Sequence, residues 1–229
     1  MTGGPPRQFP LDLPHRPALT RDDLVVTEAN RMAVAAVDHW PNWPHPVTVI
    51  VGPEGAGKSH LVAAWREMTG ARTFDGRLPE DRPFAVAIDD LEGETAREAA
   101  LFDVLNAARL GGGFVLATAR RAPGELPFRL PDLRSRLGAA ALATIAAPDD
   151  ALLRGVLAKL FADRQLDVDL RLIDYLASRM ERSLGAARRI VDRLDSEALA
   201  AKERVTRALI QRVLSDKSLA DQARAGHGD

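Results

Sequence analysis

The chain has 229 residues, of which 46% are hydrophobic and 28% charged, and its formal net charge is −1. This length allows one well-buried core, or one core with a small satellite domain. No apolar run approaches the roughly 20 residues that a membrane-spanning helix needs, so we expect neither a membrane span nor a secretory signal. The balanced charge argues against a surface that binds DNA directly, and the absence of Cys suits a reducing cytoplasm.

Residues 1–20 form a segment of their own. Five prolines interrupt it, with few apolar residues between them: Pro5, Pro6, Pro10, Pro14 and Pro17. Because proline fixes its backbone and lacks an N–H donor, we expect an extended or disordered tail here. From Thr27, a candidate N-cap, apolar residues recur at helical spacing as far as Trp40, which predicts a first helix.

Residues 21–147 alternate short apolar runs with helical patterns, which is typical of an α/β fold. Four runs lack the polar alternation of a half-exposed strand and predict parallel strands covered on both faces: 47–51, 84–88, 114–118 and 142–145. Three helices are expected between these strands: one that ends at Gly70, one over 94–110 and a short one over 130–137. The pattern therefore predicts a parallel sheet flanked by helices.

Residues 148–229 predict a separate, all-α domain. From Leu152 onward the apolar residues keep a helical period, and no further strand pattern follows. The sequence thus divides into a tail (1–20), an α/β domain (21–147) and a small helical domain (148–229).

Residues 52–59 read GPEGAGKS and lie between the first predicted strand and a helix. This is the pattern of a P-loop, whose glycines let backbone N–H groups surround phosphate oxygens while a lysine adds positive charge and a serine hydroxyl binds Mg²⁺. A chance glycine-rich turn is the alternative, but the motif stands in the strand-to-helix context that it requires. We therefore expect ADP or ATP with Mg²⁺, held by Gly52, Gly55, Ala56, Gly57, Lys58, Ser59 and His60.

Two later strands end in polar residues that suit phosphate chemistry. Asp89 follows the strand 84–88, where P-loop proteins place the carboxylate that holds Mg²⁺, and Asp90 would face the attacking water. The alternative for both is an ordinary polar strand end or a helix cap. Thr118 ends the next strand and is expected to contact the terminal phosphate or the water, although threonine is also common at strand ends.

Arg134 and Arg136 lie in LRSRL, on the short helix over 130–137. An arginine at the edge of one subunit can stabilise charge on a phosphate bound by its neighbour, which is how an arginine finger works in trans. From the residues alone, a solvated surface charge is the more common role for either side chain.

Several segments together resemble the AAA+ module of the bacterial replication initiator DnaA and its shorter relatives: GPEGAGKSHL (52–61), IDDLEG (88–93), LPDLRSRL (130–137) and the helical part from Pro148. The resemblance covers residues 22–215 and implies an AAA+ P-loop sheet followed by a small all-α lid. It also implies that Val25 and Val26, in LVVTEAN, lie near the adenine. DnaA carries a further DNA-binding domain, whereas this chain stops at Asp229, so we expect an Hda-like regulatory inactivator of DnaA rather than an initiator.

The tail supports the same resemblance. QFPLDL is similar to the QLxLxL peptide by which Hda-like proteins bind the sliding clamp, the beta subunit of DNA polymerase III. An extended peptide loses little entropy on binding, and its apolar side chains can fill separate pockets of a partner. The resemblance therefore assigns clamp contacts to Gln8, Phe9, Leu11 and Leu13.

In that family the clamp-bound regulator supplies an arginine to the ATP site of DnaA, which then hydrolyses its ATP, and Arg136 matches this arginine. The resemblance implies a negative regulator of replication initiation whose partners are DnaA and the clamp. It implies contact with DNA only through that complex, a cytoplasmic place at the replisome, and a resident nucleotide, ADP, with weak or no intrinsic hydrolysis. It leaves a homodimer open.

Two positions depart from the DnaA group. Ala119 and Arg120 stand where the group has a small residue and Asp, and Gly185 stands where it has a phosphate-sensing Arg. Arg188, one turn later, is either a substitute for that Arg or an ordinary surface residue. An autonomous ATPase of helicase-loader type remains the alternative function, because the P-loop and both acidic residues are intact. A third class would only recruit another domain or factor.

Overall fold

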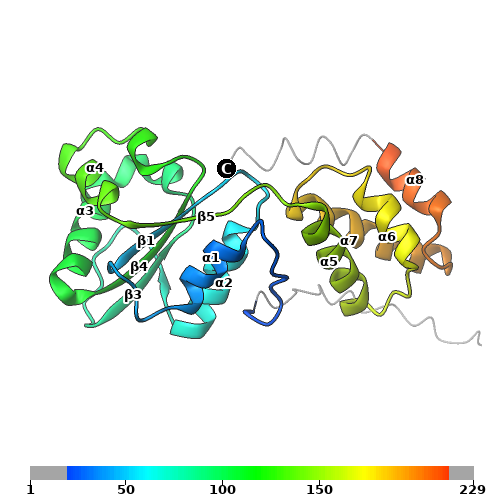
Figure 1. Cartoon of the computed structure of the whole chain (residues 1–229), viewed down its shortest axis with the longest axis horizontal. Coiled ribbons are helices and arrows are strands. Elements are labelled where there is room, and N and C mark those ends of the chain that lie inside the picture. The colour runs from blue at the N-terminus through cyan, green and yellow to red at the C-terminus, as the bar shows by residue number, and fades with distance from the viewer. Residues whose placement is uncertain (1–19, 217–229) are drawn as a thin grey trace, which may run out of the picture.

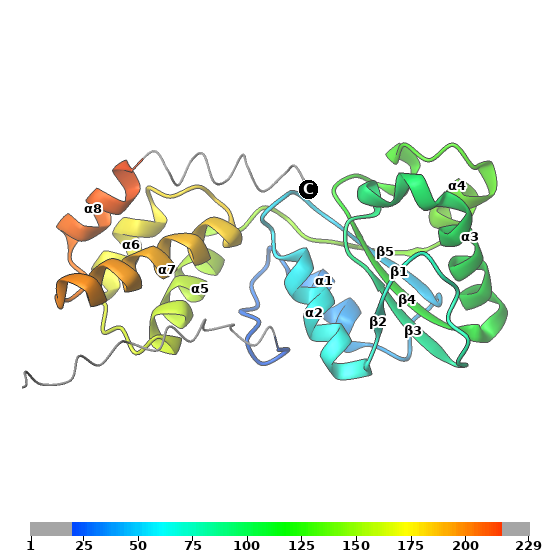
Figure 2. The same ribbon diagram turned by 180° about the vertical axis from the view of Figure 1, so that it is seen from behind.

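The structure is a computed structural model and describes residues 20–216. Within these residues a five-stranded parallel sheet has the order β2-β3-β4-β1-β5 (Figures 1 and 2). Its strands are β1 (Val47–Val51), β2 (Arg72–Thr73), β3 (Phe84–Ile88), β4 (Gly113–Ala119) and β5 (Ala141–Thr144). The predicted parallel sheet is confirmed, and β2 is an addition too short to leave a pattern in the sequence.

Helices cover both faces of the sheet (Figures 1 and 2). Two pack on one face and two on the other, namely α1 (Arg31–Asp38) with α2 (Lys58–Thr69), and α3 (Glu98–Ala107) with α4 (Pro131–Gly138). Successive side chains of a strand point to opposite faces, so Val49 packs with α3 and α4 while Ile50 packs with α1 and α2. Because both faces are covered, the strands need no polar alternation.

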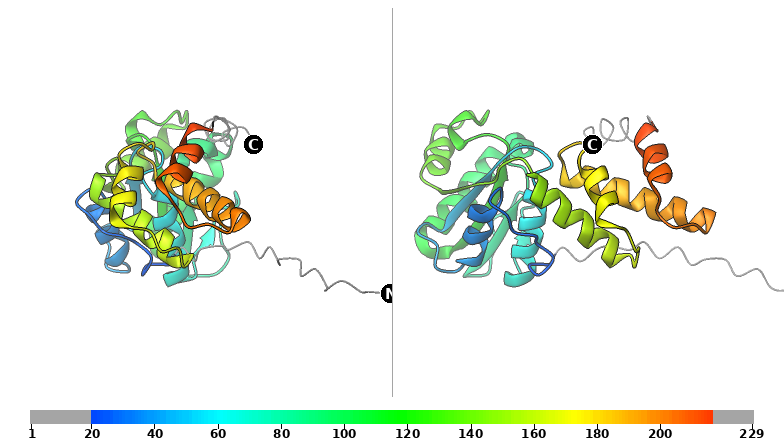
Figure 3. Two further views of the ribbon diagram at one scale, coloured as in Figure 1. Left: turned by 90° about the vertical axis from the view of Figure 1, so that its right-hand side faces the viewer. Right: turned by 45° about the vertical axis from the view of Figure 1, so that its right-hand side comes forward.

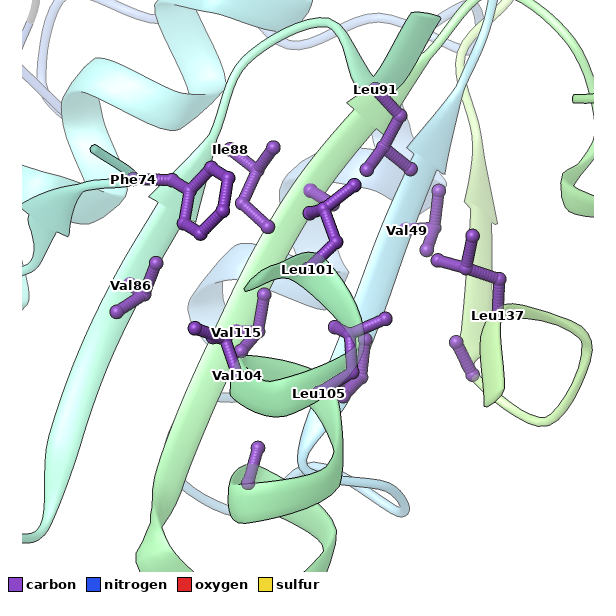
Figure 4. Packing of buried hydrophobic residues seen from close by; sticks show 14 of the residues in the cluster. Val49, Phe74, Val86, Ile88, Leu91, Leu101, Val104, Leu105, Val115 and Leu137 are labelled. Atoms are coloured by element: carbon purple, nitrogen blue, oxygen red, sulfur yellow. The ribbon is translucent and has the colours of Figure 1, made fainter. Parts of the chain in front are cut away.

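The core under α3 reaches the edge of the sheet where the acidic residues lie. Figure 4 shows Ile88 and Val115 of the sheet facing Leu101 and Leu105 of α3. Leu91, which follows the two predicted acidic residues, is fully buried in the same core. Burying a leucine contributes roughly 1.5–3 kcal/mol, so this side chain fixes the loop that carries both carboxylates.

A helical bundle, called the lid below, follows the sheet. Among the described residues it consists of α5 (Asp150–Asp163), α6 (Leu170–Ala177), α7 (Leu184–Ala201) and α8 (Arg207–Ser215). The four helices share a core of their own and lie at the end of the molecule opposite α3 and α4 (Figures 1 and 3). The predicted fold class, a flanked parallel sheet followed by a small all-α lid, is therefore confirmed. Within residues 20–216, none of the helices combines the length and the hydrophobicity of a membrane span.

Two predicted helices begin later than expected. The pattern predicts a first helix directly after Thr27, but α1 begins at Arg31. The Asn30 side chain accepts from the Thr27 N–H and donates to the Val25 carbonyl, both at 2.8 Å, and these bonds hold the segment as a turn. The helix predicted over 94–110 begins as a 3-10 segment, and its α-helical part is α3.

Candidate nucleotide-binding site

The loop after β1 has a shape that only glycine permits. Gly55 and Gly57 have φ angles of 72° and 102°, in the left-handed region where a side chain causes strain. The Gly52 N–H donates to the Ala119 carbonyl at 3.1 Å, and a Cβ on Gly52 would lie 2.3 Å from the backbone oxygen of Ile145. The glycines of the motif therefore have structural reasons to be glycine, and the loop folds back tightly at the end of β1.

A cleft of about 760 Å³ opens over this loop. The loop and the first turn of α2 supply Lys58 and Ser59, and the ends of β3 and β4 supply Asp89, Asp90 and Thr118. The parallel strands bring these side chains together because their carboxyl ends meet at one edge of the sheet. The predicted loop residues and the predicted strand-end residues thus share one cleft.

Lys58 lies over the loop that it belongs to. Its Nζ donates to the carbonyls of Gly52 at 2.8 Å and Pro53 at 2.9 Å. Burial lowers the pKa of Lys58, and the negative charges of Asp89 and Glu92 oppose this effect only in part. The ammonium group is therefore held over the loop, in the cleft.

Thr118 connects the two acidic residues. Its side chain is fully buried, and its hydroxyl donates to Asp89 Oδ1 at 2.7 Å and accepts from the Asp90 N–H at 2.8 Å. Because the single hydroxyl proton is committed to Asp89, Thr118 positions the carboxylate and has no proton left to donate to a phosphate.

Asp90 is paired with a residue for which the sequence predicted no role. Its Oδ2 lies 3.0 Å from Nη2 of Arg120, the residue that follows β4. Burial alone would raise the pKa of Asp90, but its contacts with Glu92 and with the Arg120 guanidinium outweigh this effect and lower the pKa below the ordinary value. Arg120 lines the cleft. In the sequence, the only signal that this residue is unusual was its departure from the DnaA pattern.

The lid closes the cleft from the other side. The Leu184 N–H at the start of α7 donates to the Gly55 carbonyl at 2.8 Å, and α5 is tied to the N-terminal segment by an ion pair of 2.7 Å between Lys159 and Asp23. Gly185 and Arg188 of α7 both line the cleft. The structure thus places Arg188 where a bound phosphate or ribose could reach it, rather than on an open helix surface.

A second, more apolar hollow adjoins the cleft between lid and sheet. Leu24, Val25, Ala56 and Ile145 line it, and His60 borders both spaces. Val26 does not line it and is 46% exposed. Leu24 lies beside Val25 in this hollow, and the apolar lining suits a planar base.

The oxygen donors in the cleft fit a hydrated Mg²⁺. Ser59 offers a hydroxyl and Asp89 a carboxylate, and Mg²⁺ commonly takes one or two such ligands together with phosphate oxygens and several waters. Among residues 20–216, no group of three or more His, Cys, Asp or Glu side chains could hold a metal ion by itself.

Other predicted site residues lie elsewhere. Arg136 is on α4, on the side of the sheet farthest from the lid (Figure 2), with its guanidinium 6.0 Å from the ring centroid of Phe102. Arg134, on the same helix, is exposed. The residues predicted to bind the clamp lie outside the described residues: Gln8, Phe9, Leu11 and Leu13.

Gly55→Ala should weaken both nucleotide binding and lid closure. The new Cβ would lie 2.4 Å from Ser183 Oγ and would also force a left-handed φ on alanine. Such strain costs of order 1–3 kcal/mol. If the loop relieves the strain by leaving the conformation that binds nucleotide, the affinity for nucleotide falls by about 5- to 150-fold. Titration with a fluorescent ADP analogue measures the change. Gly124→Ala is the matched control, because a Cβ there meets nothing within 4 Å, and equal affinities for the two variants would contradict the prediction.

His60 should make stability depend on pH. Burial lowers the pKa of His60, and the contact of its Nε2 with the Thr20 carbonyl at 3.3 Å opposes this effect only in part. As pH falls below about 6.5, the unfolded chain binds the proton first, so the free energy of unfolding should decrease. Urea unfolding at pH 7.5 and 5.5 should show a smaller decrease in His60→Gln than in the wild type or in His39→Gln, which alters an exposed ring. Identical decreases would contradict it.

No family model matches the chain. An uncharacterized protein of Haemophilus influenzae is 25% identical over 189 residues, which cover 74% of this chain and 82% of that protein. Among solved structures, domain III of the Thermotoga maritima replication initiation protein DnaA aligns with a TM-score of 0.75 at 20% identity, over 87% of this chain and 97% of that one.

Two further solved structures share the fold at lower similarity. A replication initiator DnaA bound to AMPPCP and single-stranded DNA gives a TM-score of 0.64 at 17% identity, over 81% of this chain and 68% of that one. A variant of Thermotoga maritima RuvB gives a TM-score of 0.67 at 17% identity, over 87% of this chain and 72% of that one. The chain therefore has the AAA+ fold of DnaA domain III and RuvB.

Proposed function

We propose that this chain is a nucleotide-binding AAA+ regulator that binds the sliding clamp and stimulates ATP hydrolysis by DnaA, as an Hda-like inactivator of replication initiation. The observation that carries the proposal is the position of Arg136 on α4, a helix that lies at the end of the molecule away from the lid and supplies no residue to the lining of the protein's own cleft. An arginine so placed suits a nucleotide bound by a neighbouring molecule better than one bound in its own cleft. Contact with DNA would come through the clamp and DnaA.

The cleft would hold ADP or ATP in this account. Lys58 and the loop N–H groups would bind the phosphates, Ser59 and Asp89 would hold Mg²⁺, and Val25 would lie against the base. When bound, the nucleotide supplies negative charge between the loop and α7, where Arg188 stands. The AMPPCP complex of a DnaA with the same fold supports this assignment. The resident nucleotide would then set the position of the lid.

The start of α4, the helix that carries Arg136, is held in place by hydrogen bonds. The Glu98 carboxylate at the start of α3 accepts from the Arg129 N–H at 3.0 Å and the Leu130 N–H at 2.6 Å, directly before α4. These two bonds lower the pKa of Glu98, so its carboxylate is charged at neutral pH. A fixed helix start reduces the entropy that Arg136 would lose on meeting a partner.

The test is a reconstituted reaction of DnaA loaded with radiolabelled ATP, the clamp loaded on DNA, and this protein. We expect phosphate release to accelerate only when all components are present, and deletion of residues 1–14 to abolish the acceleration. A double substitution, Gln8→Ala with Leu11→Ala, tests the clamp contact without shortening the chain. Unchanged release on adding the protein would refute the proposal, and stimulation without the clamp would refute the part assigned to the tail.

The second candidate is an autonomous ATPase of helicase-loader type. The hydrogen-bonded set of Asp89, Asp90 and Thr118 favours it, because these are the groups that an active P-loop enzyme uses. It predicts steady-state hydrolysis by the purified chain without clamp or DnaA, abolished by Lys58→Ala. Absent turnover by a chain that retains ADP would exclude it.

A further inference from the structure

Arg120 lies between the acidic strand end and the P-loop. Its Nη2 is 3.0 Å from Asp90 Oδ2, and its Nη1 is 3.8 Å from Glu54 Oε2 on the loop. The guanidinium therefore reaches across the cleft from the end of β4, next to the place where phosphate would bind. It thus lies near carboxylates of two different elements, unlike an arginine that contacts only solvent.

The backbone on both sides of this ion pair is fixed. The Asp90 N–H donates to Thr118 and the Asp90 backbone has a φ of 69°. Glu92 Oε1 accepts from the N–H groups of Arg120 at 2.8 Å and Arg121 at 3.2 Å. Because neither backbone can move freely, the two side chains meet with little further loss of entropy.

Both carboxylate oxygens of Asp90 are engaged or enclosed. Oδ1 is buried, and Oδ2 is the oxygen that Arg120 contacts. In hydrolysis of ATP, a water oxygen bonds to the terminal phosphorus, the bond from that phosphorus to the bridging oxygen breaks, and a water proton passes to a base, leaving ADP and phosphate. In the observed arrangement Oδ1 is enclosed, and a water that reaches the exposed part of Asp90 meets Oδ2, whose charge is already paired with Arg120.

We propose that Arg120 is a positioning residue that holds Asp90 away from the attacking water, so that this cleft retains nucleotide instead of turning it over. The inference rests on the proposed nucleotide binding and names the side chain that suppresses hydrolysis. Both partners are nearly half exposed, and a pair of this kind contributes little to stability, so its removal should leave the fold intact.

The test compares Arg120→Ala with Arg121→Ala. Arg121 is exposed, and its hydrogen bond to Glu92 uses its backbone N–H, so its substitution changes charge equally and leaves the Asp90 pair in place. We expect the turnover number for ATP to rise at least ~10-fold in Arg120→Ala, since a general base contributes about 10²–10⁴ in rate. Arg121→Ala should match the wild type, and the double variant Arg120→Ala with Asp90→Asn should return to the low rate.

Binding separates the two levels of the account. The Kd for the non-hydrolysable analogue AMPPNP, measured by calorimetry, should change little between the wild type and Arg120→Ala. If AMPPNP binds neither protein, the proposed nucleotide site itself fails. If it binds both while the rate stays low or falls in Arg120→Ala, or if the gain survives Asp90→Asn, the role of Arg120 is overturned.

Discussion

Arg136→Ala should reduce stimulation of DnaA hydrolysis by about 10³-fold or more, to the rate of DnaA without the regulator. A guanidinium supplied in trans stabilises the charge that spreads over the phosphate in the transition state, and alanine supplies none. The measurement is phosphate release from ATP-loaded DnaA in the presence of the clamp loaded on DNA, under single-turnover conditions. The binding of ADP by the variant should be unchanged, because no residue of α4 lines the cleft.

Arg134→Ala is the control for this substitution. It removes the same charge two residues away on the same helix and should have a far smaller effect. Arg136 also packs over the Phe102 ring, a contact of roughly 0.5–1 kcal/mol at an exposed site, so thermal unfolding of both variants will show whether folding is preserved. Equal losses in the two variants, or retained stimulation by Arg136→Ala, would contradict the assignment of the finger to Arg136.

Lys58→Ala should abolish stabilisation of the fold by ADP. A ligand at 100 times its Kd adds about 2.7 kcal/mol to the free energy of unfolding, and alanine removes the only charged Nζ that lies over the loop carbonyls in the cleft of the described structure. Thermal unfolding with and without Mg-ADP measures the difference. Lys202→Gln is the matched control, since Lys202 lies just beyond the end of α7. An equal shift of Tm by ADP in Lys58→Ala and in the control would contradict the assignment.

The features that the sequence predicted best are local ones. The P-loop was recognisable because consecutive backbone units and two neighbouring side chains carry its chemistry. The structure adds the reason for one of its glycines, since a Cβ on Gly52 would clash with Ile145. The strands were recognisable because sheets covered on both faces need uninterrupted apolar runs. The start of α1 was predicted wrongly, because side-chain bonds from Asn30 compete with helix formation.

The features that the sequence did not predict depend on which strands are neighbours. Arg120 meets Asp90 because β3 pairs with β4 in a register that sets Ile88 beside Ala117, so the residues after both strands lie together. Neither composition nor periodicity records that pairing. The position of Arg188 in the cleft likewise depends on how the lid packs against the loop. The hydrogen bond from the Leu184 N–H to the Gly55 carbonyl joins the two.

The most direct test of the account is calorimetric titration of the purified chain with ADP and with AMP in the presence of Mg²⁺. If main-chain amides of the loop and Lys58 surround a polyphosphate, ADP should bind with a measurable heat, and AMP should bind at least ~10-fold more weakly because it lacks one set of charge-assisted hydrogen bonds. No heat with ADP, or equal affinities for ADP and AMP, would contradict the claim that this cleft is built for phosphates.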